Sequence, residues 1–217
     1  MKKIGILGTG DVGNRIATRL VALGYEVKMG SRTANNEKAV AWAKQNGEKA
    51  STGTFAEVAD FGNIIFNCVK GENTLSVFEQ AGLEKFSGKI IVDITMPLDL
   101  PKGFPFSLLP QYSNTTSLSE EIQKLIPDAK VTKSLNIVNN ELMANGEKAV
   151  PTATMLLAGN DAQAKEEVKA ILTQFGWKDI LDLGGIQAAR GMESFSSMWA
   201  YVYQATQNAN FTITINR

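Results

Sequence analysis

The sequence predicts an α/β fold: a doubly wound, mostly parallel sheet followed by a small α+β C-terminal subdomain. Short apolar runs rich in β-branched residues alternate with segments in which apolar residues recur every three or four positions. This alternation of strand and helix patterns favours a parallel sheet covered by helices. The 217 residues, 44% hydrophobic and 20% charged, suffice for one large domain, or for one domain with a small second one.

Strands are expected where an apolar run is short and is bounded by glycine, proline or polar residues. At the C-terminal end, Phe211, Ile213 and Ile215 alternate with polar residues, which is the pattern of a half-buried strand. The predicted strands span residues 3–7, 26–29, 63–69, 89–94, 130–135, 154–158, 178–183 and 211–215.

Helices are expected where apolar residues share one face and where capping residues mark the ends. Thr54 and Glu57 have the spacing of a capping box, Asp161 is a good N-cap, and Gly24 ends the first helix. The predicted helices span residues 11–23, 37–45, 54–61, 74–80, 119–125, 161–175 and 187–208.

A polar, loop-like stretch at residues 139–151 marks the predicted subdomain boundary. Before it, the helix and strand patterns alternate regularly; after it, about a third of the chain mixes the two more loosely. We therefore expect a first domain at residues 1–145 and a small C-terminal subdomain at residues 146–217 that closes a cleft.

The amino-acid composition excludes several classes of function. Histidine is absent, which rules out Ser-His-Asp and Cys-His catalysis, histidine zinc sites and a histidine proton relay. A single cysteine, Cys68, rules out an intrachain disulfide and a cysteine zinc site, so we expect no metal. The formal net charge is zero and no run approaches the ~20 apolar residues of a membrane span. We expect a cytoplasmic protein that binds neither nucleic acid nor membrane.

A glycine-rich loop carries the chemistry. It follows the first predicted strand, opens the first predicted helix, and has the spacing G-x-G-x-x-G in Gly8-Thr9-Gly10-Asp11-Val12-Gly13. In this context the first glycine permits a tight turn, the second lets a pyrophosphate approach the backbone, and the third lets helix and strand pack closely. The helix N-terminus then offers free N–H groups to phosphates. The sequence therefore predicts a Rossmann-type dinucleotide-binding domain.

The end of the second predicted strand indicates which dinucleotide binds. An NAD enzyme would carry Asp or Glu there, but the chain has Gly30-Ser31-Arg32-Thr33 and no carboxylate between Glu26 and Glu37. Arg32 can bind a 2′-phosphate bidentately, with Ser31 and Thr33 donating from their hydroxyls. Lys38 either adds a second cation or is a solvated helix lysine. These residues predict NADP(H).

Together these segments resemble the NADP-dependent coenzyme F420 reductases (F420H2:NADP oxidoreductases) and their bacterial relatives. Residues 4–13 and 30–32 carry the resemblance, with Asp-Ile-Thr-Met-Pro-Leu at 93–98 and Lys-Ser-Leu-Asn-Ile at 133–137. The resemblance covers about the first 140 residues well and the remainder only in element order. It departs from the family pattern at Lys70, where a proline is usual, and at Met96, where an asparagine is usual.

The resemblance implies a deazaflavin in the cleft between two domains, a homodimer, and a set of site residues. Thr9, Ser31 and Arg32 would contact the 2′-phosphate, and Gly10, Asp11 and Val12 would surround the pyrophosphate. Thr95, Met96, Pro97 and Asn136 would lie near the nicotinamide. Val69 and Lys70 are further cofactor-binding candidates.

The function predicted is hydride transfer between NADP(H) and a deazaflavin or flavin acceptor, with coenzyme F420 or a flavin as the second substrate. Such a transfer needs aligned rings and no protein acid, which suits a chain without histidine. We therefore expect no catalytic side chain. Two alternatives remain: a small imine or carbonyl reductase, and a non-enzymatic NADP(H) sensor. An enzyme should have a deep second pocket beside the nicotinamide, which a sensor should fill with side chains.

Four further positions have a plain interpretation. Cys68 is expected to be a buried, inert thiol, and Asp93 is expected to bond loop N–H groups rather than act as an acid. Arg190 and Glu193, three residues apart on a predicted helix, are expected to form an ion pair. Trp199 is expected to serve packing or a dimer interface, and stacking on a flat cofactor is the less favoured alternative.

Overall fold

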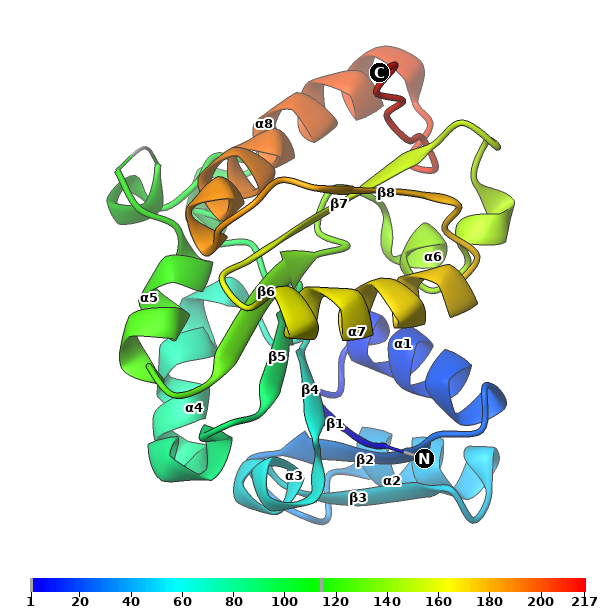
Figure 1. Cartoon of the computed structure of the whole chain (residues 1–217), viewed down its shortest axis with the longest axis vertical. Helices are drawn as coiled ribbons and strands as arrows, with labels where there is room; N and C mark the ends of the chain where they lie inside the picture. Colours follow the sequence, from blue (N-terminus) through cyan, green and yellow to red (C-terminus); the bar gives the residue numbers. More distant parts are fainter. Residues whose placement is uncertain (1, 114) are drawn as a thin grey trace.

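The computed structural model describes residues 2–113 and 115–217, and these form a single eight-stranded sheet flanked by helices (Figure 1). The strand order is β3-β2-β1-β4-β5-β6-β7-β8, and every neighbouring pair is parallel except β6 and β7. The predicted fold class is therefore confirmed. The strands are β1 (Lys3–Leu7), β2 (Glu26–Ser31), β3 (Ala50–Thr54), β4 (Ile64–Asn67), β5 (Ile90–Asp93), β6 (Lys130–Ser134), β7 (Thr154–Gly159) and β8 (Asp179–Asp182).

Helices cover both faces of the sheet and enclose two separate apolar cores. Helices α1, α2 and α7 pack on one face, where Leu20, Trp42 and Leu172 are buried, and helices α3, α4 and α5 pack on the other, around Phe78 and Ile122. This burial is what stabilises each helix against the sheet. The helices are α1 (Asp11–Ala22), α2 (Glu37–Asn46), α3 (Phe55–Phe61), α4 (Thr74–Ala81), α5 (Leu118–Leu125), α6 (Asn140–Met143), α7 (Ala162–Gln174) and α8 (Ala189–Thr206).

The order of the strands creates a switch point between β1 and β4. After β1 the chain builds β2 and β3 on one side, then returns to place β4 and β5 on the other. Loops leaving the carboxyl ends of β1 and β4 therefore diverge, and in open α/β sheets this divergence is where ligands bind. Helix α8 runs across the same end of the sheet (Figure 1), so side chains from late in the chain meet those loops.

The predicted helix caps are present. The Thr54 hydroxyl accepts from the Glu57 N–H at 3.2 Å, and the Glu57 carboxylate accepts from the Thr54 N–H at 2.7 Å, completing the capping box. Asp161 accepts from the Ala164 N–H at 2.7 Å and caps α7. Two of the predicted helix starts thus follow from local hydrogen bonds alone.

Three predictions of secondary structure are wrong. The sequence pattern misses β3, because Ala-Ser-Thr-Gly-Thr has no apolar run; this edge strand pairs with β2 alone. It also misses α6, which lies in the predicted loop at 139–151. The strand predicted at 211–215 is absent: Ile213 and Ile215 pack on the core, but the segment makes isolated bonds with Thr152 and Thr154 and no strand ladder.

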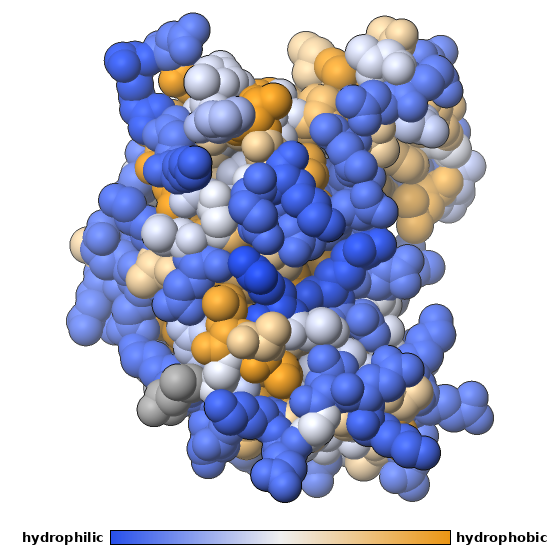
Figure 2. Space-filling model, turned by 90° about the vertical axis from the view of Figure 1, so that its right-hand side faces the viewer, coloured by the Kyte–Doolittle hydropathy of each residue, from blue (hydrophilic) through white to orange (hydrophobic). Residues whose placement is uncertain are grey.

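The sheet continues across the predicted subdomain boundary. Strand β7 lies antiparallel to β6, and β8 extends the sheet beyond it. The face shown in Figure 2 is mostly hydrophilic, with apolar residues in separate small groups. Among the described residues, no helix is both long and apolar enough to span a bilayer.

Candidate functional site

The glycine loop has the geometry that its spacing predicts. Gly8 has a φ of +110°, and a Cβ there would lie 2.9 Å from the Cys68 carbonyl oxygen. A Cβ at Gly13 would lie 2.4 Å from the Gly8 carbonyl oxygen, so α1 packs against the turn only because residue 13 is glycine. A Cβ at Gly10 would meet nothing within 4 Å, and Gly10 provides no side-chain cap to α1. The N–H groups of the first turn therefore face open space, which suits a pyrophosphate.

A cavity of about 520 Å³ opens beside this loop, and we call it the cationic cavity. Arg32, Lys38 and Lys70 line it, and no carboxylate does among the described residues. Within residues 2–113 and 115–217, none of these three cations forms an ion pair. Unpaired cations around a helix N-terminus attract an anion. The full lining comprises Gly8, Thr9, Gly10, Arg32, Lys38, Phe55, Cys68, Val69, Lys70, Asn73, Ser76, Val77 and Gln80.

Two hydroxyl residues predicted beside Arg32 do not line this cavity. The Ser31 hydroxyl donates to the Thr33 carbonyl oxygen at 2.6 Å and accepts from the Thr33 N–H at 3.2 Å. Its hydrogen is thus used to hold the turn that presents Arg32. Asp11, Gly13 and Pro97 also lie outside the lining of the cationic cavity and of the two cavities described next.

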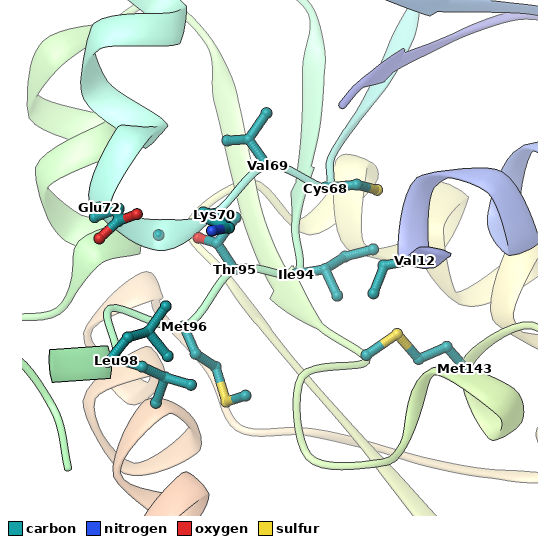
Figure 3. Close-up of a pocket in the computed structure, with 12 residues that line it drawn as sticks. Val12, Cys68, Val69, Lys70, Glu72, Ile94, Thr95, Met96, Leu98 and Met143 are labelled. Atoms are coloured by element: carbon teal, nitrogen blue, oxygen red, sulfur yellow. The ribbon is translucent and has the colours of Figure 1, made fainter. Parts of the chain in front are cut away.

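The central cavity, about 200 Å³, adjoins the cationic cavity and shares Cys68, Val69 and Lys70 with it. Figure 3 shows Val12 and Met143 on one side, and Met96 on the other, with Thr95 between the strand ends. The loop after β4 lies directly on the loop after β5, since a Cβ at Gly71 would be only 2.2 Å from the Met96 carbonyl oxygen. The contact of these two loops makes the cavity narrow. Most of its lining side chains are apolar, and Lys70 and Glu72 are its charged ones among the described residues.

The distal cavity, about 330 Å³, adjoins the central cavity and shares Val12, Met96 and Met143 with it. None of the described residues that line it is ionisable. The lining is Val12, Met96, Phe106, Asn136, Val138, Asn139, Asn140, Met143, Ser196 and Trp199.

Three residues that line the distal cavity each carry a buried polar atom with no hydrogen-bond partner among the described residues: Asn136 Oδ1, Ser196 Oγ and Trp199 Nε1. Asn136 is held in place by its other amide atom, because Nδ2 donates to the Met192 carbonyl oxygen at 2.7 Å. The Trp199 indole is held between the rings of Tyr203 and Phe211, stacked at centroid distances of 5.6 and 5.7 Å. An unpaired buried polar atom is costly, so this set is suited to a ligand that pairs with it.

Cys68 is half-buried rather than fully buried, and it lines the cationic and central cavities. Desolvation, with a smaller contribution from the nearby Asp93 charge, raises the pKa of its thiol well above the usual range, which favours the less reactive protonated form. Asp93 Oδ1 accepts from the N–H of Thr95 at 3.2 Å, as expected of a residue that bonds a loop N–H. It also accepts from the Thr95 hydroxyl at 2.8 Å and from Asn67 Nδ2 at 2.9 Å.

Behind the central and distal cavities lies a buried ionic cluster that the sequence analysis misses. Lys133, Asp93 and Glu193 are fully buried, and Lys133 Nζ lies 2.8 Å from Asp93 Oδ2 and 3.0 Å from Glu193 Oε1. Burial alone lowers the pKa of Lys133, but the two carboxylates outweigh it and hold that pKa above its usual value. A signal existed: Glu193 falls on the face of α8 that also buries Met192, Ser196 and Ala200, where a charge must find a partner.

The predicted Arg190–Glu193 ion pair is wrong. Arg190 instead makes a bidentate bond to Glu120 on α5, at 2.8 and 2.7 Å, whereas Glu193 pairs with Lys133. The i,i+3 spacing permits a local pair, but long-range partners on α5 and β6 compete better here.

Comparisons with known proteins agree with this geometry. The sequence profile of the family described as NADP oxidoreductase, coenzyme F420-dependent, matches residues 3–97. The crystal structure of a candidate F420-dependent NADP reductase from Arthrobacter sp. FB24 covers all of both chains with 38% identity and a TM-score of 0.94. This chain belongs to the coenzyme F420-dependent NADP oxidoreductase family.

Two further relatives match most of this chain in sequence. The F420-dependent NADP reductase of Methanocaldococcus jannaschii is 29% identical over 205 residues, which are 90% of each chain. Metalloreductase STEAP3 of Rattus norvegicus is 30% identical over 193 residues, which are 88% of this chain but only 36% of the metalloreductase. As a member of the family, the chain is an NADP-dependent oxidoreductase, and its three adjoining cavities form the candidate active site.

Proposed function

We propose that this oxidoreductase transfers a hydride between NADP(H) and a deazaflavin or flavin acceptor, with coenzyme F420 as the first candidate. One observation carries the proposal: the distal cavity shares a wall with the central cavity, and three of its lining residues carry buried polar atoms without a partner among the described residues. A second flat ring can thus lie against the site of the nicotinamide. The names of the Arthrobacter and Methanocaldococcus proteins support coenzyme F420 in particular.

The cofactor residues follow from the order of the three cavities. Arg32, with Lys38 beside it, would bind the 2′-phosphate in the cationic cavity, and the free N–H groups at the start of α1 would bind the pyrophosphate. Thr95 and Met96 would then flank the nicotinamide in the central cavity. The open space at Gly10 supports this arrangement, since any side chain there would fill it.

The chain's own task is to align two rings and to exclude water. When bound, NADPH supplies a hydride, one hydrogen with two electrons, and the acceptor takes its balancing proton from solvent. The walls of the distal cavity carry no ionisable side chain among the described residues, so they offer no general acid. Val12, Met96 and Met143 belong to both the central and the distal cavity and would hold the rings in contact in an apolar setting.

The unpaired atoms indicate the chemical edge of the acceptor. Trp199 Nε1 can only donate, the Ser196 hydroxyl can donate or accept, and Asn136 Oδ1 can only accept. An imide edge, with carbonyl oxygens flanking an N–H, offers matching partners, and both flavins and deazaflavins carry one. Quinones and metal chelates lack that N–H and would leave Asn136 Oδ1 unpaired.

The two alternative functions receive less support. An imine reductase needs a proton donor near the substrate, and no described residue lining the distal cavity is ionisable. A sensor would fill this space with side chains, whereas the cavity measures about 330 Å³.

The proposal extends to organisation and location. Exposed apolar side chains on α8 and the loop before it, among them Met198 and Tyr201 at 58% and 60%, support a homodimer. Cys68, which has no disulfide partner, supports a cytoplasmic location. The change of strand direction between β6 and β7 supports a division into an NADP-binding domain at residues 1–145 and a small subdomain at residues 146–217. The homodimer is tested by light scattering of the purified protein, which measures its molar mass in solution.

The test of function is NADPH oxidation by the purified protein with a panel of acceptors: an oxidised deazaflavin, FMN, FAD, a quinone and a ferric chelate. We expect turnover with the imide-bearing rings only. Trp199→Phe, which removes the indole N–H but keeps an aromatic ring between Tyr203 and Phe211, should raise the KM of the acceptor and leave NADPH binding unchanged. No turnover with any acceptor would contradict the proposal.

A further inference from the structure

The buried ionic cluster joins the parts of the chain that form the active site. The Lys133 ammonium group on β6 donates to three acceptors: Asp93 Oδ2 at the end of β5, Glu193 Oε1 on α8, and the carbonyl oxygen of Thr95 in the loop after β5. An ammonium group has three hydrogens, so all its donors are used. One side chain thus fixes a strand end, a helix and a loop at the same point.

Helix α5 is fixed to the same cluster. The Glu193 carboxylate accepts from the backbone N–H groups of Leu118 and Ser119, at 2.9 and 3.2 Å, in the first turn of α5. The Ser119 hydroxyl donates to Asp93 Oδ2 at 2.6 Å. The positive end of α5 therefore balances a cluster of one cation and two carboxylates.

Stability alone does not explain this cluster. Moving charges out of water costs several kcal/mol per ion, and well-packed apolar residues in place of a buried ion pair often give an equal or more stable protein. Apolar side chains, however, do not hold atoms at fixed distances and directions as hydrogen-bonded charges do. The cluster is better explained by the geometry that it imposes.

What the cluster fixes is the relation between the two walls of the active site. Thr95, bonded to Lys133, lines the central cavity together with its neighbour Met96. Ser196 lies one turn beyond Glu193 on α8 and lines the distal cavity. Asn136, three residues after Lys133, lines the same cavity and bonds the carbonyl oxygen of Met192, the residue before Glu193.

We propose that Lys133 and Glu193 are positioning residues that set the loop at 95–97 at a fixed distance from α8, so that the nicotinamide and the acceptor ring meet in contact. The inference rests on the proposed function, and it concerns residues that touch neither ring. A misplacement of ~1 Å at a reacting centre can cost about 10²-fold in rate, so a small shift of this joint is sufficient to slow the transfer.

The test compares Glu193→Gln with a matched control on the same two helices. Glu120→Gln weakens the bidentate Arg190–Glu120 pair, which also joins α5 to α8 but touches neither Lys133 nor Thr95. Three quantities are measured for each variant: the Kd of NADPH, the fluorescence emission of bound NADPH, and the single-turnover rate of hydride transfer to the best acceptor of the wild-type protein.

For Glu193→Gln we expect a Kd of NADPH within about twofold of wild type, because the cationic cavity is untouched. We expect the emission of bound NADPH to change and the transfer rate to fall by roughly ten- to a hundredfold. Glu120→Gln should leave all three quantities near wild type. If Glu193→Gln does not fold, Ser119→Ala removes the hydroxyl's bonds to Asp93 and Glu193 but keeps all three charges, and it should shift the emission and rate in the same direction by a smaller factor.

The outcomes separate this inference from the proposed function. Equal behaviour of the Glu193 and Glu120 variants, or wild-type emission and rate in Glu193→Gln, overturns the positioning role. A change of emission in Glu193→Gln alone, in a protein that reduces no acceptor, supports the positioning role and contradicts the proposed function. Failure of the wild-type protein to bind NADPH overturns both.

Discussion

The cationic cavity and the distal cavity are built from the chain in different ways. The first lies within residues 8–80: the glycine loop at 8–10, Arg32 and Lys38, Phe55, and the segment from Cys68 to Gln80. The second draws on α1, the loop after β5, the segment after β6 with α6, and α8, so its walls meet across more than a hundred residues. The difference indicates that cofactor binding depends on local backbone geometry, whereas acceptor binding depends on long-range packing and the buried ionic cluster.

The largest effect is expected from Lys133→Met, which should lower the free energy of unfolding by disrupting the buried ionic cluster. It leaves Asp93 and Glu193 buried without their cation, and loss of one partner from a buried pair costs about 3–5 kcal/mol. The free energy of unfolding, measured by urea titration, should fall by that amount. Lys124→Met, which breaks an exposed pair with Glu121, is the control and should cost at most about 1 kcal/mol. Similar losses in both variants would show that the cluster is not a distinctive part of the fold.

The cationic cavity is tested by Arg32→Ala. We expect NADPH to bind at least tenfold more tightly than NADH in the wild type, about 1.4 kcal/mol, and the substitution to remove most of this preference. Calorimetry measures both affinities, and an unfolding curve checks that stability is unchanged. Lys44→Ala, on the same α2 helix as Lys38, should keep the preference. An unchanged ratio in Arg32→Ala would exclude Arg32 as the group that recognises the 2′-phosphate.

An effect of similar size is expected at the distal cavity. Ser196→Ala removes one buried hydroxyl, so one polar group of the bound hydride acceptor loses its hydrogen-bond partner. The cost is about 1–3 kcal/mol, or roughly five- to a hundredfold in the KM of the hydride acceptor. NADPH affinity should stay the same because Ser196 lines only the distal cavity. Steady-state kinetics with varied acceptor measures the change. Ser194→Ala, at an exposed position of α8 that lines none of the three cavities, is the control. Equal KM values in the two variants would argue against an acceptor contact at Ser196.

The smallest effect concerns alkaline pH and Cys68. The pKa of this thiol is raised above its ordinary value of 9.0, so above that pH the unfolded chain loses a proton that the folded chain keeps. Stability must then fall as pH rises, by at most about 1.4 kcal/mol per pH unit. The raised pKa of Lys133 acts with the same sign, but only above 10.5. Urea titrations between these two values should show a weaker pH dependence in Cys68→Ala than in the wild type.

The two regions also differ in how far the sequence predicts them. The mostly parallel sheet, the glycine loop and the Thr54 and Asp161 caps follow from periodicity and from residues a few positions apart. Periodicity could not find β3, a polar edge strand with a single neighbour. Periodicity also predicted a strand at 211–215, where apolar and polar residues alternate, but the sheet contains no strand there.

The buried cluster lay beyond local patterns for a similar reason. Lys133 and Glu193 are 60 residues apart, and Glu193 has a nearer candidate partner in Arg190. Choosing between a surface pair and a buried one requires knowing that α8 crosses the sheet end, which depends on the whole topology. The same knowledge is needed to see that Asn136, Ser196 and Trp199 face one cavity.

The shared walls of the cavities have a consequence for how this enzyme can diverge. Val12 and Met96 each line two cavities, so a substitution at either changes the walls of both cavities at once. Arg32 and Ser196 each line only one cavity and are free to change alone. Adaptation to a new acceptor is therefore expected to begin on α8. Laboratory evolution that starts from residue 196 should change the acceptor specificity while NADPH binding is retained.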